Sequence, residues 1–88
     1  MTDDDRIEKV KATVTQIKPL LAGKDDGVAG AVLADLVALW LAGHFVPGDE
    51  EATGSARADL LAAHVALVRG LVPINAEALG TGPVSGHA

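Results

Sequence analysis

The chain has 88 residues, enough for one small domain, and contains no cysteine, which excludes disulfides, thiol nucleophiles and cysteine-based metal clusters. Its formal net charge of -5 has the wrong sign for neutralising phosphates, so we expect no nucleic-acid binding. Hydrophobic residues make up 49% of the chain but aromatic residues only 2%, which points to a helical protein with a thin, alanine-rich core.

The first predicted helix is amphipathic. Its apolar residues recur at alternating steps of three and four, as in a helix that packs on a neighbour: Ile7, Val10, Val14, Ile17 and Leu21. Thr2 is its predicted N-cap, followed by three aspartates that the helix dipole favours. Pro19 predicts that the helix either kinks or stops there.

The second predicted helix runs from Gly27 to Gly43 or His44, with Asp25 or Asp26 as its N-cap. It is apolar on all sides, which is typical of a buried helix or a membrane span. Asp35 at its centre, the many alanines and the lack of flanking lysine or arginine clusters disfavour a membrane span. We therefore predict a buried soluble helix whose acid has a partner.

The third predicted helix runs from Ala56 to Val72, with Ser55 as its N-cap and Pro73 at its end. The preceding segment, VPGDEEATGS, has the composition of an exposed loop. The helix carries one wide apolar stripe with His64 in its middle, whereas Asp59 and Arg69 lie away from it. A short helical turn capped by Asn75 and closed by Gly80 should follow, and residues 81–88 have the composition of a flexible tail.

Asp35 and His64 are the candidate site residues. If the second and third helices form an antiparallel hairpin about Asp49, both residues lie at the same height, so we predict that they hydrogen-bond, within one subunit or across a dimer. Arg57 or Arg69 is the next choice as partner of Asp35. A metal site is not predicted, because stable sites need three or four ligands and no metal-binding histidine spacing occurs.

The sequence thus predicts an all-α fold: a hairpin of the second and third helices, an amphipathic N-terminal helix and a short C-terminal helical turn, forming one domain over residues 1–80. Small core side chains leave apolar surface uncovered, so we expect a homodimer. Its predicted interface comprises Gly27, Gly30, Ala34, Val37, Trp40 and Leu41.

Two classes of function remain open. The first is a non-enzymatic interaction or accessory protein that acts through a self-associating helix surface, with no cofactor and with an unidentified protein as a further partner. The second is a small-molecule or metal site around Asp35 and His64, with catalysis as an open option. We favour the first, because no residue set supplies a third catalytic member or a cofactor motif. The N-terminal residues MTDDDRIEKVK lack a secretory signal, so we expect a cytoplasmic location.

Overall fold

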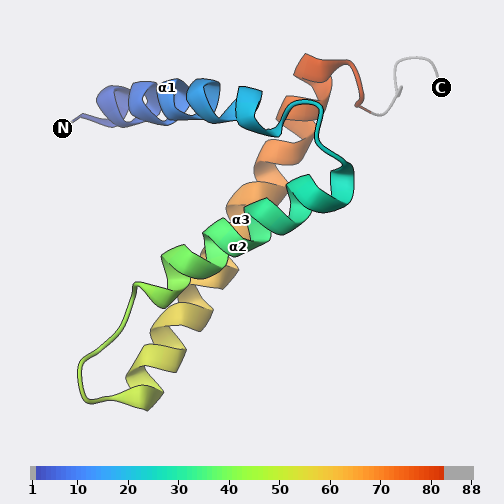
Figure 1. The fold of residues 1–88 in the computed structure, drawn as a ribbon. Helices are drawn as coiled ribbons and strands as arrows, with labels where there is room; N and C mark the ends of the chain where they lie inside the picture. The colour runs from blue at the N-terminus through green and yellow to red at the C-terminus, as the bar shows by residue number, and fades with distance from the viewer. Residues whose placement is uncertain (1, 83–88) are drawn as a thin grey trace. The chain divides into compact units, whose positions relative to one another are not determined.

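The computed structural model describes residues 2–82 and contains three α-helices (Figure 1). They are α1 (Asp3–Leu21), α2 (Asp26–Ala42) and α3 (Glu50–Leu79). Residues 2–82 include no strand, which confirms the predicted all-α class. The chain divides into two compact units, Met1–Val37 and Ala38–Ala88, and the boundary between them lies within α2.

The start of α1 follows the prediction. Thr2 caps it in a capping box: its hydroxyl accepts from the amide of Asp5 at 3.2 Å, and the Asp5 carboxylate accepts from the amide of Thr2 at 3.3 Å. The helix continues past Pro19 to Leu21, so the alternative in which it stops at Pro19 is wrong. A proline removes a single donor from the ladder, and the amide of Ala22 still donates to the carbonyl of Lys18 at 3.0 Å.

The boundaries of α2 lie within two residues of the prediction. The Asp25 carboxylate accepts from the amides of Gly27 at 3.0 Å and Val28 at 3.3 Å, which confirms the predicted N-terminal cap. The helix ends at Ala42, and Gly43 still donates to the carbonyl of Leu39 at 3.1 Å.

The predicted start of α3 at Ala56 is wrong, because the helix begins at Glu50. Asp49, not Ser55, is its N-cap: the Asp49 carboxylate accepts from the amide of Ala52 at 2.9 Å. The acids at positions 50 and 51, predicted to lie in a loop, occupy the first turn, where the helix dipole favours negative charge.

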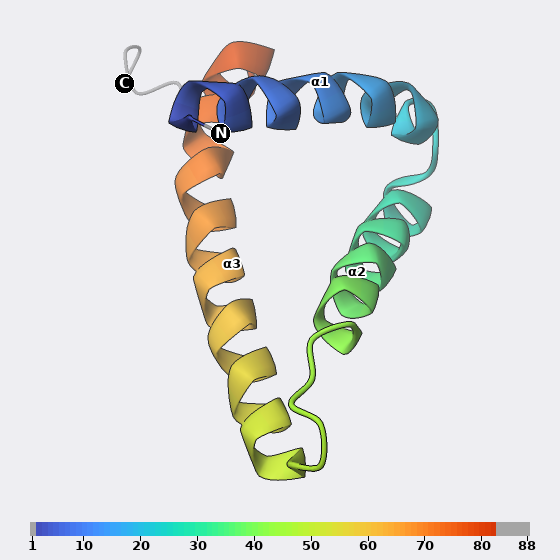
Figure 2. The same ribbon diagram turned by 90° about the vertical axis from the view of Figure 1, so that its left-hand side faces the viewer.

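The predicted end of α3 at Pro73 is also wrong, since the helix continues through it to Leu79 (Figure 2). Asn75 therefore lies inside α3 and caps no separate turn. Gly80 closes the helix as predicted, with a left-handed φ of 74°, and the amides of Thr81 and Gly82 both donate to the carbonyl of Ala76. Of the predicted tail, residues 83–88 lie outside the described residues.

None of the residues 2–82 is buried. Large apolar side chains stay exposed along all three helices, among them Val10 of α1, Leu39 of α2 and Leu67 of α3. By length and composition alone, α3 could also cross a membrane. The apolar surface of the chain therefore lacks the cover that a folded domain in water needs.

Candidate functional site

The guanidinium of Arg57 closes the C-terminal end of α2. Its Nε donates to the carbonyls of Leu41 at 3.1 Å and His44 at 2.9 Å, and its Nη2 donates to the carbonyl of Ala42 at 2.9 Å. Carbonyls at a helix C-terminus lack intrahelical donors and carry partial negative charge. Arg57, which is half-buried, supplies both the donors and a positive charge.

Thr53, one turn before Arg57, binds the connection between α2 and α3, which comprises residues 43–49. Its hydroxyl accepts from the amide of Val46 at 2.9 Å and donates to the carbonyl of Asp49 at 2.8 Å. Gly48 makes the turn with a left-handed φ of 76°. Residues 43–49 are thus fixed by side chains of α3.

Trp40 and two histidines form an aromatic cluster beside this connection. The ring of Trp40 lies 5.4 Å from that of His44, edge to face, and 5.5 Å from that of His64. The Nδ1–H of His44 donates to the Trp40 carbonyl at 2.8 Å, since a carbonyl oxygen can only accept. The cluster joins the last turns of α2 to the middle of α3.

The structure places His64 against Trp40, and Asp35 belongs to the other compact unit. Trp40 lies about 140° around α2 from Asp35, so contact with Trp40 does not by itself bring His64 to the carboxylate. The hydrogen bond between Asp35 and His64 stays a prediction. Arg57, a suggested alternative partner of Asp35, donates to backbone carbonyls.

The residues of the predicted dimer interface differ in exposure. Val37 and Leu41 are half-buried, and the other four members are exposed: Gly27, Gly30, Ala34 and Trp40. The ring of Trp40 already contacts those of His44 and His64. The small residues of the set therefore remain open to a partner.

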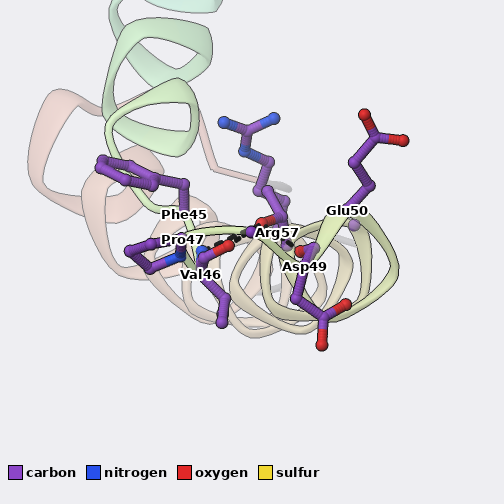
Figure 3. A pocket seen from close by; sticks show the side chains of 9 residues that line it. Phe45, Val46, Pro47, Asp49, Glu50 and Arg57 are labelled. Carbon is purple, nitrogen blue, oxygen red and sulfur yellow. Dashed lines mark hydrogen bonds between the residues drawn. The ribbon is translucent and has the colours of Figure 1, made fainter.

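An open depression of about 960 Å³ lies where the connection meets the start of α3 (Figure 3). Phe45 and Pro47 line one side, and Asp49 and Glu50 line the other. The Asp49 carboxylate is used as a helix cap, and two nitrogens of Arg57 are bound to carbonyls. The depression holds no nucleophile beside a base, so it offers no catalytic arrangement.

No group of three or more histidine, cysteine, aspartate or glutamate side chains gathers to hold a metal ion within residues 2–82. Comparisons with protein-family models, curated proteins and solved structures found no match to the chain. The exposed apolar surfaces of α1, α2 and α3 are therefore the features from which a function can be inferred.

Sequence reasoning missed the roles of Thr53 and Arg57. Their spacing of four residues is the signal that could have shown them, because it places both on one face of a helix. The predicted loop over residues 50–55 hides this signal, because it places Thr53 outside the helix. With α3 starting at Glu50, the two side chains point to one edge of the helix, where α2 ends.

Proposed function

We propose that the protein is a non-enzymatic interaction protein that works as a homodimer in the cytoplasm, through apolar helix surfaces. The observation that carries the proposal is that none of the residues 2–82 is buried, although 49% of the chain is hydrophobic. Association with a second copy supplies apolar burial without requiring any other component.

The small residues of α2 support the choice of this helix as the main contact. Gly30 and Ala34 are exposed and lie one turn apart, so a second helix can approach the α2 backbone closely there. Leu33, which lies about 60° around the helix from Gly30, is also exposed and would be covered by a partner on this face.

Sedimentation velocity across a dilution series, in buffer without detergent, tests the proposal. We expect a dimer at micromolar concentration. Ala34→Arg should shift the equilibrium to monomer, whereas Ala62→Arg, the same change at an exposed position of α3, should leave the dimer intact. A wild-type chain that sediments as a monomer throughout, or that remains soluble only in detergent, contradicts the proposal.

The alternative of a ligand site at Asp35 and His64 makes a different prediction. A divalent metal ion or a metabolite should then raise the melting temperature, and the rise should grow with the logarithm of the ligand concentration above its Kd. This rise should vanish in His64→Leu while the dimer persists. An interaction protein should show no such specific stabilisation.

A further inference from the structure

The sequence of α3 contains a heptad seam that the structure divides into two halves. Steps of four and three residues run along one face of the helix: Thr53, Arg57, Leu60, His64, Leu67, Leu71, Ile74 and Ala78. The first four members are half-buried and the last four are exposed. Burial therefore ends in the middle of a seam that continues for another 14 residues.

The first half of the seam is polar and is used within the chain. Thr53 and Arg57 bind the backbone of the connection and of α2, and His64 lies against Trp40. The second half is apolar, with Leu67 61%, Leu71 43% and Ile74 64% exposed. Three layers of large aliphatic side chains are thus presented without cover, which is the pattern of a helix that packs on another helix.

The α1 helix carries a seam of the same period. Ile7, Val10 and Val14 follow steps of three and four residues and are all exposed. Since α1 has only 19 residues, it depends on packing against a partner for much of its stability. The stripe continues to Ile17 and Leu21, and its first three layers match the spacing of the three layers that α3 leaves open.

We propose that α1 of one copy packs antiparallel on the exposed half of the α3 seam of a second copy; this inference rests on the proposed self-association. The contact is made twice in a symmetric dimer. It adds to the proposed α2 interface and assigns a role to the N-terminal helix.

The register follows from the heptads. Ile7 would face Ile74, Val10 would face Leu71, and Val14 would face Leu67 of the second copy. In an antiparallel pair, the flanking positions that meet beside these layers are Arg6 of α1 and Glu77 of α3. Opposite charges therefore meet at the edge of the same register that aligns the apolar layers.

Charge also favours α1 over a second α3 as the occupant. In an antiparallel pair of two α3 helices, Glu77 would face Gly70 or Ala63, depending on the register, and would gain no partner. With α1, Glu77 faces the cation Arg6 in the register given above. Lys11 and Lys18 also occupy flanking positions beside the apolar stripe of α1. In this register neither of them faces a cation of α3.

Disulfide trapping tests the contact in a chain that has no cysteine of its own. Val10→Cys carrying an affinity tag is mixed with untagged Leu71→Cys, refolded together and oxidised with glutathione disulfide. We expect the mixed disulfide to exceed each symmetric one by clearly more than the twofold ratio that random pairing of the two chains gives. Untagged Leu61→Cys, an exposed position outside the seam, is the matched control and should give little mixed product.

A charge exchange supplies a second readout. Arg6→Glu or Glu77→Arg alone should weaken the dimer about two- to thirtyfold in Kd, the range for two exposed ion pairs, and the double variant should recover most of the affinity. Lys9→Glu, which makes the same change in charge away from the seam, should not be rescued by Glu77→Arg.

The outcomes separate this inference from the proposed function. A dimer that forms only symmetric disulfides, or a Val10→Cys/Leu71→Cys chain that cross-links only at monomer mass, overturns the α1–α3 contact and leaves the proposed dimer standing. A wild-type chain that is monomeric at all concentrations overturns both.

Discussion

Arg57 and His44 lie 13 residues apart in the chain, and Nε of Arg57 donates a hydrogen bond to the carbonyl of His44 over 2.9 Å. The same guanidinium also binds Leu41 and Ala42. A side chain of one helix thereby acts as the C-terminal cap of another, so the end of α2 depends on α3 being formed.

Arg57→Ala should destabilise the chain by about 2 kcal/mol, because charge-assisted hydrogen bonds are lost while half-exposure limits the effect. Arg57→Lys should recover little, since an ammonium lacks the planar fork that reaches three carbonyls. Urea unfolding followed by circular dichroism measures both. Arg69→Ala is the matched control and should stay within about 0.5 kcal/mol of wild type; equal losses at the two positions would contradict the role of Arg57.

Thr53→Val keeps the shape of the side chain but removes the hydroxyl that binds Val46 and Asp49. We expect a loss of about 1–2 kcal/mol in the free energy of unfolding. Thr53→Ser retains the hydroxyl and should lose clearly less. Amide hydrogen exchange at Val46 should accelerate in the valine variant only, and unchanged exchange there would show that the loop does not need this bond.

Gly80→Ala and Gly54→Ala should act in opposite directions. Gly80 has a φ of 74°, which costs an alanine about 1 kcal/mol, so the melting temperature should fall. Gly54 lies inside α3 with open space where a Cβ would stand, so alanine should add up to about 1 kcal/mol through helix propensity. Two changes of the same sign would contradict the assigned end of α3.

A double-mutant cycle tests the predicted pair of Asp35 and His64. Asp35→Asn should cost modestly, and His64→Leu should cost more by leaving the acid without its partner. Replacing both by apolar residues should recover much of the loss. Strict additivity, within about 0.5 kcal/mol, would show that the two side chains are not partners.

Local signals were sufficient for the fold class and for two of the helix starts. Thr2 and Asp25 cap their helices through bonds that span two or three residues, so the sequence around them determines the outcome. The apolar spacing of α1 and the continuous apolar run of α2 were equally local. Helix content could therefore be predicted without knowledge of the tertiary contacts.

The start and end of α3 depend on more than local sequence. Asp49 and Ser55 are both good N-cap residues by type. The helix starts at Asp49, where Thr53 also binds the amide of Val46 seven residues earlier, and a contact of this span cannot be read from a few neighbouring residues. Pro73 disfavours a helix by propensity, yet α3 continues on both sides of it. The contact of His64 with Trp40 was missed because a hairpin that turns about Asp49 sets His64 level with Asp35 and not with Trp40.

Trp40 is the only tryptophan of the chain, and the sequence contains no tyrosine. Its indole ring lies beside the imidazoles of His44 and His64. Nearly all near-ultraviolet emission of the protein therefore originates from the point where the end of α2 meets α3. A stopped-flow fluorescence trace of refolding consequently reports the surroundings of this one side chain, with no other indole to separate from it.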